Sequence, residues 1–146
     1  MPLLSDRIQS QVRKTLEAMA GPVKLVVFTQ SSEALECDMC SETRGLLEEI
    51  AALAPAGNLS VEVRDFLTDA DAKALYKIDK IPAVAVVGAK DYGIRLYGIP
   101  AGYEFSSLMD DILTVSKGES GLSSATKAAL ASVNRPIHIQ VYVTPT

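Results

Sequence analysis

Residues 37–40 read Cys37-Asp38-Met39-Cys40, and these two cysteines are the only ones in the 146-residue chain. On a helix, a spacing of three positions places the two sulfurs on one face, about one turn apart. At the N-terminus of a helix such a pair can close a short disulfide. The pair is therefore a candidate redox centre.

Two opposing electrostatic effects are expected for a thiolate at this place. The free N–H groups and the dipole at a helix N-terminus stabilise it by about 0.3–1 kcal/mol, or up to about 2 kcal/mol when it is partly buried. Since one pKa unit is about 1.4 kcal/mol, this lowers the thiol pKa by up to about one unit. Asp38 opposes the effect, because its charge at roughly 6 Å costs the thiolate about 0.7 kcal/mol in water. We therefore expect a mildly activated thiol and a reductase-leaning potential.

Two other interpretations of the cysteine pair are open. A C-x-x-C pair can be half of a zinc site, but structural zinc takes four ligands and the other obvious candidate is a lone histidine, His138. The cysteines can also be inert, although structural cysteines usually lie among apolar residues. Their neighbours here are polar: Glu36, Asp38, Ser41 and Glu42. This setting favours the redox interpretation.

Length and composition exclude several classes of function. A chain of 146 residues that is 48% hydrophobic predicts one domain with a sizeable core. A net charge of -4 and 5% aromatic residues give no basic, base-stacking surface, so we expect no nucleic-acid partner. The longest apolar runs, such as 83–87, are strand-sized, so no membrane span is expected.

The N-terminus and the cysteine usage predict a location in the cytoplasm. Asp6 and Arg7 follow soon after Met1, and no apolar signal core accompanies them. In a reducing compartment a lone C-x-x-C is more often a catalytic dithiol than a permanent structural disulfide. We also expect no cofactor, because the sequence holds no phosphate-binding glycine pattern and no cluster of metal ligands.

The first half of the chain alternates helices and strands. An amphipathic helix is predicted before Gly21-Pro22, which ends the pattern. The apolar positions of this helix are Leu4, Ile8, Val12, Leu16 and Met19. Residues 23–29 are almost all apolar and predict a central strand that is covered on both faces. A polar loop, 30–36, leads to Cys37, and a helix then runs to Pro55.

A second strand, a short helix and a hairpin follow. Residues 59–66 predict a strand, and Thr68 is a candidate cap for a helix that carries Ala72, Leu75 and Ile78. Ile81-Pro82 opens a strand over 83–87, a position at which proline's missing N–H is tolerated.

A hairpin turn is expected at 91–93, followed by an antiparallel strand over 94–97. A helix from about Tyr103 to Val115 then packs against the sheet through the apolar positions Phe105, Leu108, Ile112 and Val115.

The last part of the chain repeats its beginning. After a polar linker, residues 125–133 predict a helix and 136–143 predict a strand, in which Val141-Tyr142-Val143-Thr144 echoes Val26-Val27-Phe28-Thr29. A second unit therefore begins and breaks off. The alternative is that this strand covers a sheet edge of the same domain.

The element order, the C-x-x-C at the start of the first long core helix and the Ile-Pro before the hairpin resemble the thioredoxin-like fold. More closely, the chain is similar to the N-terminal unit of the tandem glutaredoxin-like protein disulfide oxidoreductases. The similar stretches are Tyr97-Gly98-Ile99-Pro100-Ala101-Gly102-Tyr103-Glu104-Phe105, Leu108 to Ile112, and Val141-Tyr142-Val143-Thr144-Pro145-Thr146. The resemblance covers nearly the whole chain.

This resemblance implies an α/β fold with a central mixed sheet flanked by helices. Residues 1–118 are expected to form a thioredoxin-like unit. Residues 119–146 would contribute a linker, a helix and the first strand of a truncated second unit, so that the chain would be a fragment of a longer protein.

The resemblance also assigns roles to residues. Cys37 matches the attacking thiol, Cys40 the resolving thiol and Pro82 the cis-proline beside them. Ile81 would offer its backbone to an extended substrate, and Asp38 and Met39 are expected to contact substrate.

The chain departs from thioredoxins in two respects. Its loop 30–36 is longer, and the strand before the motif carries no buried acid, so Cys40 has no evident base. Asp65 could serve only if it points inward, and an acid at a strand end is more often solvated. Other nearby side chains are given structural roles: Arg44 and Lys80 as surface cations, and Tyr97 and Tyr103 as packing residues.

The implied function is that of a protein disulfide oxidoreductase, a reductase or isomerase that works by thiol–disulfide exchange. The implied partners are protein or peptide disulfides and a thiol or reductase electron donor. A homodimer through an exposed final strand is a further expectation.

Two alternatives stay open. One is an electron-relay domain similar to the N-terminal domain of the flavoprotein that reduces alkyl-hydroperoxide peroxidases. The other is a non-catalytic scaffold or dimerisation unit of a tandem oxidoreductase.

Overall fold

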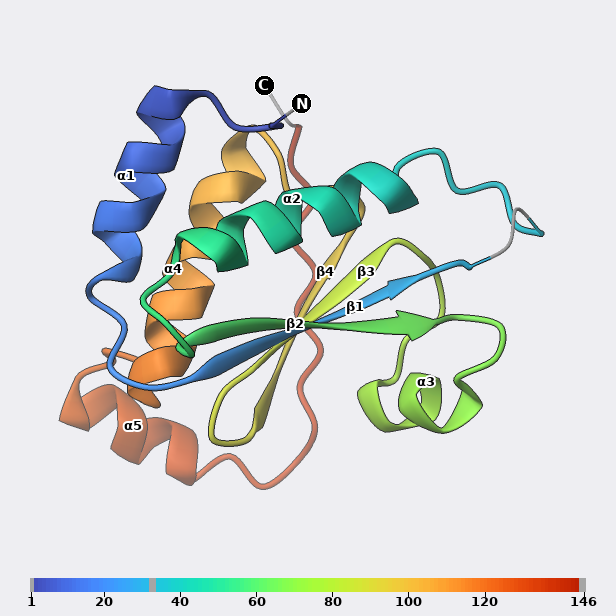
Figure 1. Ribbon diagram of the computed structural model, residues 1–146. Helices are drawn as coiled ribbons and strands as arrows, with labels where there is room; N and C mark the ends of the chain where they lie inside the picture. Colours follow the sequence, from blue (N-terminus) through green and yellow to red (C-terminus); the bar gives the residue numbers. More distant parts are fainter. Residues whose placement is uncertain (1, 32–33, 145–146) are drawn as a thin grey trace.

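The computed structural model describes residues 2–31 and 34–144 and contains a mixed sheet of four strands (Figure 1). Across the sheet the strands run in the order β2-β1-β3-β4. Their bounds are β1 Val23–Thr29, β2 Leu59–Asp65, β3 Ala83–Val87 and β4 Asp91–Tyr97. β1 is parallel to β2 and antiparallel to β3, and β3 is antiparallel to β4. The predicted mixed sheet is confirmed.

β1 is an inner strand, as its apolar sequence predicts. Every residue of β1 except Lys24 is buried, and consecutive side chains enter hydrophobic clusters on opposite faces of the sheet. Lys24 reaches Glu62 on β2, with 2.6 Å between Nζ and Oε2. The loop to the cysteines starts at the carboxyl end of this buried strand.

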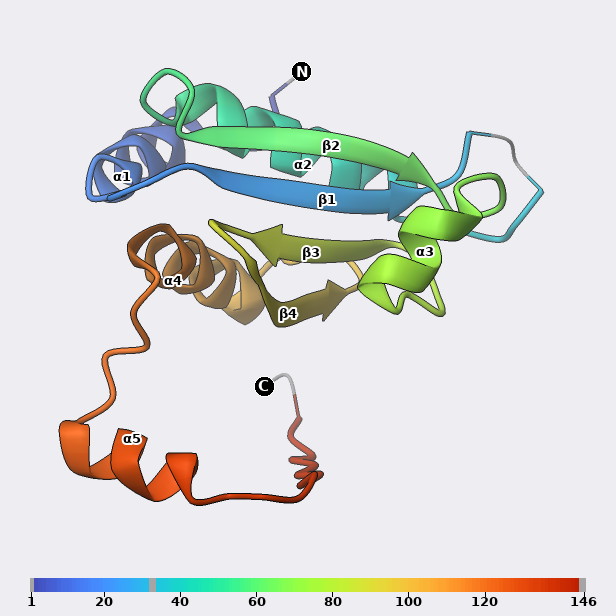
Figure 2. The same cartoon turned by 90° about the horizontal axis from the view of Figure 1, so that it is seen from below.

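Helices cover the two faces unequally. The larger hydrophobic cluster joins the sheet to α1 (Asp6–Leu16), α2 (Cys40–Leu53) and α4 (Tyr103–Lys117). The other face carries the short α3 (Ala70–Tyr76), whose Tyr76 ring packs edge-on against Phe28, with 5.9 Å between ring centroids. Figure 2 shows α3 in front of the strands and α2 behind them.

The short helix α3 differs from its prediction in two ways. It begins at Ala70 with Asp69 at the N-cap, so the prediction that Thr68 caps the helix is wrong. The backbone N–H of Thr68 instead donates to the carboxylate of Asp65, at 2.9 Å. Leu75 is 70% exposed, because Tyr76 and Ile78 occupy the apolar positions against the sheet.

The hairpin between β3 and β4 turns three residues earlier than expected. The turn lies at 88–90, where the Gly88 N–H donates to the Lys90 carbonyl at 3.2 Å, and β4 already begins at Asp91. Asp91 belongs to the strand because it pairs with Val87 in the ladder, and its carboxylate pairs with Arg95, with 2.5 Å between Oδ2 and Nη2. The antiparallel pairing of the two strands is confirmed.

The C-terminal segment contains the predicted helix but lacks the predicted strand. Helix α5 (Ser124–Ala131) begins after Ser123, whose hydroxyl accepts a hydrogen bond from the Thr126 N–H at 3.2 Å. Residues 136–143 form no strand, so that expectation is wrong for this chain. An extended segment becomes a strand only when its N–H and C=O groups pair with a neighbour, and the segment runs clear of β4 (Figure 2).

None of the helices in the described part of the chain is long and apolar enough to span a membrane.

Candidate functional site

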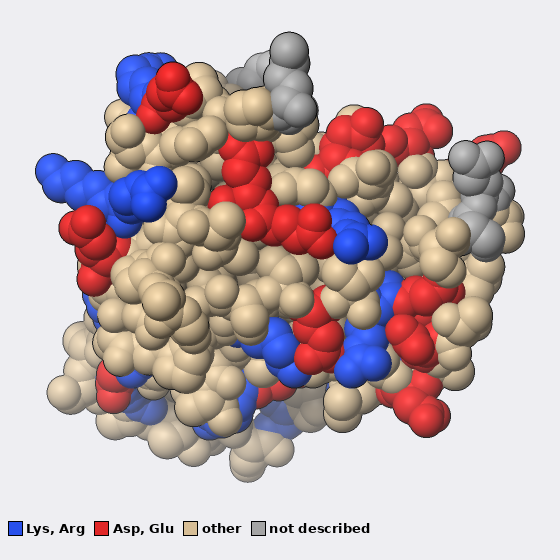
Figure 3. Space-filling view, viewed as in Figure 1, with Lys and Arg blue, Asp and Glu red and all other residues tan. Residues whose placement is uncertain are grey.

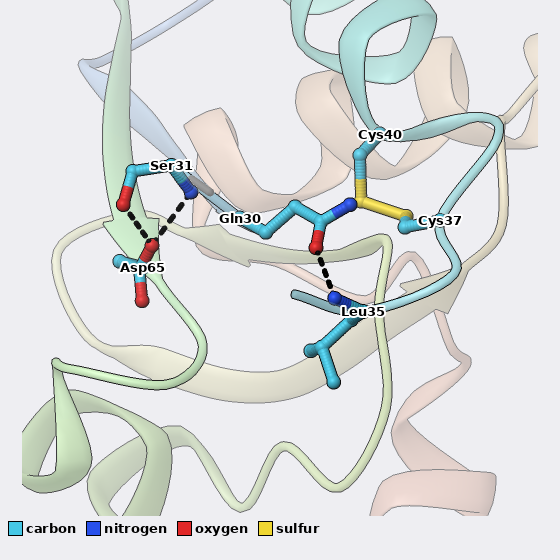
Figure 4. The surroundings of a disulfide bond; sticks show 6 residues. All are labelled: Gln30, Ser31, Leu35, Cys37, Cys40 and Asp65. Atoms are coloured by element: carbon cyan, nitrogen blue, oxygen red, sulfur yellow. Dashed lines mark hydrogen bonds between the residues drawn. A yellow bond between two sulfur atoms is a disulfide. The ribbon is translucent and has the colours of Figure 1, made fainter. Parts of the chain in front are cut away.

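Cys37 and Cys40 form a disulfide at the start of α2, with 5.5 Å between their Cα atoms (Figure 4). Cys40 is the first residue of the helix, and Cys37 lies in the turn just before it. The Cys40 N–H faces the carbonyl oxygen of Cys37 at 3.4 Å, so backbone contact closes the turn that brings the sulfurs together. The predicted position of the motif at a helix N-terminus is confirmed.

The two cysteines differ in exposure. Cys37 is half-buried, whereas Cys40 is 3% exposed and belongs to the buried residues of α2. A thiol in the position of Cys37 can be reached from solvent, and one in the position of Cys40 is shielded by the first turn of the helix. This asymmetry suits a pair in which the accessible sulfur attacks a substrate disulfide and the shielded sulfur then resolves the mixed disulfide.

A cavity of about 300 Å³ opens beside the disulfide. It is formed by the end of β1, the start of the following loop and the first turns of α2. Its lining residues are Thr29, Gln30, Ser31, Cys37, Cys40, Ser41 and Arg44. The cavity therefore gives the disulfide an open side that polar groups surround.

The loop between β1 and Cys37 is held by hydrogen bonds at two of its described residues, Ser31 and Leu35. Ser31 donates from its N–H at 2.7 Å and from its hydroxyl at 2.5 Å to the same oxygen of Asp65. Gln30 accepts a hydrogen bond from the Leu35 N–H at its side-chain oxygen, at 2.9 Å (Figure 4). The extra length that distinguishes this loop is thus anchored to the end of β2 and to β1.

Asp65 anchors the loop, and its contacts are directed away from a role as a base for Cys40. Its second oxygen accepts from the N–H groups of Leu67 at 2.8 Å and Thr68 at 2.9 Å. With the two bonds from Ser31, these contacts stabilise the charged carboxylate, so the pKa of Asp65 falls well below its usual range. Asp65 is half-buried as a residue, but the hydrogen bonds of its carboxylate lie at the exposed surface, as expected of an acid at a strand end.

The buried polar side chains of the described residues are Thr29 and Thr43. Thr29 ends β1 and lines the cavity, and Thr43 lies three residues after Cys40 on α2. Neither can act as a carboxylate base. Within residues 2–31 and 34–144, no three side chains of the His, Cys, Asp and Glu types come together as metal ligands.

Pro82 and Ile81 lie at the same end of the sheet as the disulfide. Ala83 pairs with Phe28 in the antiparallel register, which places Pro82 next to Thr29. The Ile81-Pro82 peptide bond is cis, and Pro82 is buried. Ile81 is half-buried against the smaller hydrophobic cluster. The cavity lining contains Thr29 but neither of these two residues.

The residues between the cysteines are open to solvent. Asp38 is exposed, and Met39 is 41% exposed. Both side chains are accessible to solvent beside Cys37.

Other predicted residues take structural positions. Lys80 lies over the ring of Tyr97, with Nζ 4.7 Å from the ring centroid. Tyr103 is 79% exposed at the first position of α4, so its predicted packing role is wrong. The preceding loop turns there at Gly102, which has a φ of 61°, and Phe105 packs against the core instead.

The rim of the site carries more negative than positive charge. Glu36, Asp38 and Glu42 are exposed around the disulfide. The cation that lines the cavity, Arg44, is paired with Glu48, with 2.7 Å between Nε and Oε1. Figure 3 shows acidic side chains spread over the face that carries α2.

Gln30 and Ser31 are the site residues that sequence reasoning missed. Both line the cavity, and both hold the loop that delivers Cys37. The signal that could have found them was their place directly after a buried strand, where polar side chains often define a site. Their partners at Leu35 and Asp65 cannot be inferred from the sequence, because they depend on how the loop folds back.

Three solved structures resemble this chain. A protein disulfide oxidoreductase from Aeropyrum pernix K1 is 33% identical, with a TM-score of 0.77 over 88% of this chain and 54% of that one. The alkylhydroperoxide reductase protein AhpF from Enterococcus faecalis is 22% identical, with a TM-score of 0.76 over 88% of this chain and 60% of that one. The NTD_N/C domain of AhpF from the same organism is 21% identical, with a TM-score of 0.70 over 86% of this chain and 58% of that one.

No protein-family model and no curated protein matches the sequence. The chain spans about half the length of the oxidoreductase from A. pernix. The two comparisons below 25% identity show the fold alone. All three structures confirm the thioredoxin-like fold, and the structure from A. pernix confirms the resemblance to a protein disulfide oxidoreductase. This chain carries the C-x-x-C disulfide in that fold.

Proposed function

We propose that this thioredoxin-like chain is a protein disulfide oxidoreductase that works through Cys37 and Cys40. The observation that carries the proposal is the disulfide between a half-buried Cys37 and a buried Cys40 at the N-terminus of α2. A helix N-terminus stabilises a thiolate, and a short pair with unequal exposure separates an attacking sulfur from a resolving one. The similarity to the oxidoreductase from A. pernix supports the same activity.

The proposed reaction begins with the reduced pair. The Cys37 thiolate attacks one sulfur of a substrate disulfide, forms a mixed disulfide and expels the other substrate sulfur, which takes up a proton. Cys40 then loses its proton and attacks Cys37. The Cys37–Cys40 bond forms, and the second substrate sulfur leaves as a thiol. Two electrons pass from the pair to the substrate, and a dithiol or reductase donor returns them.

Four groups are proposed to assist this exchange. Asp38 and Met39 contact the substrate at the exposed tip, and Ile81 offers its backbone to an extended segment. Pro82 keeps that end of the sheet free of a competing N–H donor, because proline has none. The register that places Pro82 beside Thr29, at the edge of the cavity, supports this assignment.

The proposed substrates are protein or peptide disulfides, with a small thiol or a reductase as electron donor and no bound cofactor. The proposed location is the cytoplasm, where a dithiol of this kind is kept reduced.

Trapping of the mixed disulfide tests the proposal. In the variant Cys40→Ser, the mixed disulfide between Cys37 and a peptide should accumulate because no internal thiol resolves it. The variant Cys37→Ser should form far less of it, because Cys40 is shielded. The wild-type chain should also accelerate the reduction of insulin by dithiothreitol. Equal trapping by both variants, together with no acceleration, would contradict the proposal.

We further propose that residues 119–146 open a second unit and that, in this chain, they mediate a homodimer. The side chains of Ile137, Ile139, Val141 and Val143 are 62–83% exposed. An extended apolar segment of this kind pairs readily with the edge strand of a second copy. Sedimentation velocity should show a dimer whose fraction rises with protein concentration. The variant Val141→Lys should abolish this dimer. A monomer at all concentrations would argue against it.

A further inference from the structure

We propose that Gln30 is a positioning residue for the redox pair, whose side-chain amide holds the Cys37 loop with its oxygen and stabilises the reduced pair with its NH2 group. This inference rests on the proposed function and deepens it. Gln30 would set the thiol pKa and the potential of the site while it fixes the long loop that leads to Cys37.

The position of Gln30 comes from the end of β1. β1 ends at Thr29, so Gln30 leaves a buried strand with its backbone direction fixed by the sheet. Its side chain is half-buried and lines the cavity together with both cysteines. Figure 4 shows the amide group pointing toward the disulfide. A side chain in this place lies close to the sulfurs and is partly shielded from bulk solvent.

The orientation of the amide follows from its oxygen. The side-chain oxygen accepts the Leu35 N–H at 2.9 Å, and an N–H group can pair only with the oxygen of the amide. The NH2 group is therefore directed to the opposite side, toward the sulfurs (Figure 4). Leu35 precedes Cys37 by two residues, so one amide group connects the strand, the loop and the redox pair.

The NH2 group gains importance when the disulfide is reduced. Reduction breaks the sulfur–sulfur bond with two electrons from a dithiol donor, and one proton goes to Cys40 while Cys37 stays a thiolate. A disulfide sulfur is a weak hydrogen-bond acceptor, but a thiolate carries a full negative charge and accepts strongly. The amide dipole thus favours the reduced form over the oxidised one and lowers the pKa of the thiol.

The other charges at the site do not replace this donor. Asp38 and the rim acids Glu36 and Glu42 disfavour a thiolate by like charge. Arg44 lines the cavity but is engaged by Glu48. Asp65 carries its charge at the far anchor of the loop, where Ser31 binds it. Among the described residues, the helix N-terminus and the Gln30 amide are groups at the site that favour the thiolate.

The variant Gln30→Glu separates the two roles of the amide. A glutamate keeps an oxygen for the Leu35 N–H, but it replaces the NH2 donor with a negative oxygen at nearly the same shape. We expect the loop to stay folded while the thiolate is destabilised. The pKa of the Cys37 thiol, taken from the pH dependence of its alkylation by iodoacetamide, should rise by about one unit. The equilibrium with dithiothreitol should shift about tenfold toward the protein disulfide.

Two further variants complete the test. Gln30→Met removes both halves of the amide at similar length, and it should give a smaller rise in the thiol pKa. Gln11→Glu makes the same change on an exposed position of α1 and should leave the pKa and the equilibrium unchanged. Lower melting temperatures with an unchanged thiol pKa in both Gln30 variants would show a purely structural role and overturn the inference.

Failure of the proposed function would look different from failure of this inference. If wild-type protein formed no reversible disulfide with dithiothreitol, the oxidoreductase proposal would fall and the role of Gln30 with it. If the wild-type pair were reversible and Gln30→Glu left its equilibrium unchanged, only the role of Gln30 would be refuted.

Discussion

Asp65 shows how one residue can support a redox site without touching the sulfurs. Its carboxylate accepts four hydrogen bonds, two from Ser31 in the loop and two from the backbone that follows β2. Ser31 lies next to Gln30, and both line the cavity. The carboxylate therefore holds the start of the long loop at the place where the strands end.

The variant Asp65→Asn should destabilise the fold in a pH-dependent way. Because hydrogen bonds lower the pKa of Asp65 in the folded state, the carboxylate contributes stability above its unfolded pKa of about 3.9, and this stability is lost as pH falls below that value. The melting temperature of the variant should lie below that of the wild type at pH 7, and the gap should narrow steadily below about pH 4.

Thermal unfolding between pH 2 and 8 measures this gap. Glu17→Gln, at the exposed C-cap position of α1, is the matched control and should show no such pH-dependent gap. A gap for Asp65→Asn that stays constant down to pH 2 would contradict the anchoring role.

The sequence predicts the reactive residues of the site better than the residues that hold them in place. The spacing of Cys37 and Cys40 and the Ile81-Pro82 pair stand out in the sequence, because they occupy fixed places relative to a helix start and a strand start. Gln30 and Asp65 act through contacts with backbone N–H groups of a loop. Such contacts follow no periodic pattern, and this is why sequence reasoning did not find the part played by Gln30.

At the scale of elements, hydrophobic patterns locate the strands and long helices to within a few residues. β1 and β3 match their predicted bounds, because each is a short apolar run buried in the sheet. The hairpin turn differs from its prediction because Asp91 already pairs with Val87 across a shift in register. The cap of α3 differs because α3 begins after Asp69, while the Thr68 N–H donates to Asp65. The prediction of a strand over 136–143 was wrong because a strand also needs a neighbouring strand to pair with, and composition does not reveal one.

The junction of β3 with the end of β1 carries a prediction for exchange. Pro82 is buried, lies beside Thr29 in the sheet and has no N–H to donate. Pro82→Ala adds an N–H near the cavity and removes part of a buried ring. We expect the rate of reduction of a peptide disulfide by the reduced protein to fall severalfold, measured by stopped-flow kinetics.

Pro55→Ala is a matched control for this change. Pro55 is exposed just beyond the opposite end of α2 from Cys40, so its replacement should leave the rate unchanged. An unchanged rate for Pro82→Ala would count against its role in substrate exchange.

At the scale of the whole molecule, charge should influence which disulfides react. The chain carries a net charge of -4, and three exposed acids, Glu36, Asp38 and Glu42, surround the disulfide. Arg44 offsets little of this charge because it is paired with Glu48. A cationic disulfide should therefore approach the reduced site more readily than an anionic one of the same size.

Cystamine and dithiodiglycolate form a suitable pair of probes with opposite charges. One unit charge at about 7 Å from another contributes about 0.6 kcal/mol in water, so the rim should favour cystamine by roughly tenfold at low salt. The preference should shrink toward unity at about 1 M salt, where the screening length is about 3 Å. The triple variant Glu36→Gln, Asp38→Asn, Glu42→Gln should lose it. Equal rates at low salt would refute electrostatic selection.

The reduction potential of the Cys37–Cys40 couple is the decisive measurement for the proposed redox activity. Protein would be equilibrated with defined ratios of reduced and oxidised dithiothreitol or glutathione, and its free thiols trapped and counted. We expect a reversible two-electron couple that lies toward the reductase end of the range for thioredoxin-like proteins, about -270 to -200 mV. If the chain formed no intrachain disulfide at any ratio, or if its cysteines held zinc, the proposed redox activity would be contradicted and a non-catalytic scaffold would be favoured.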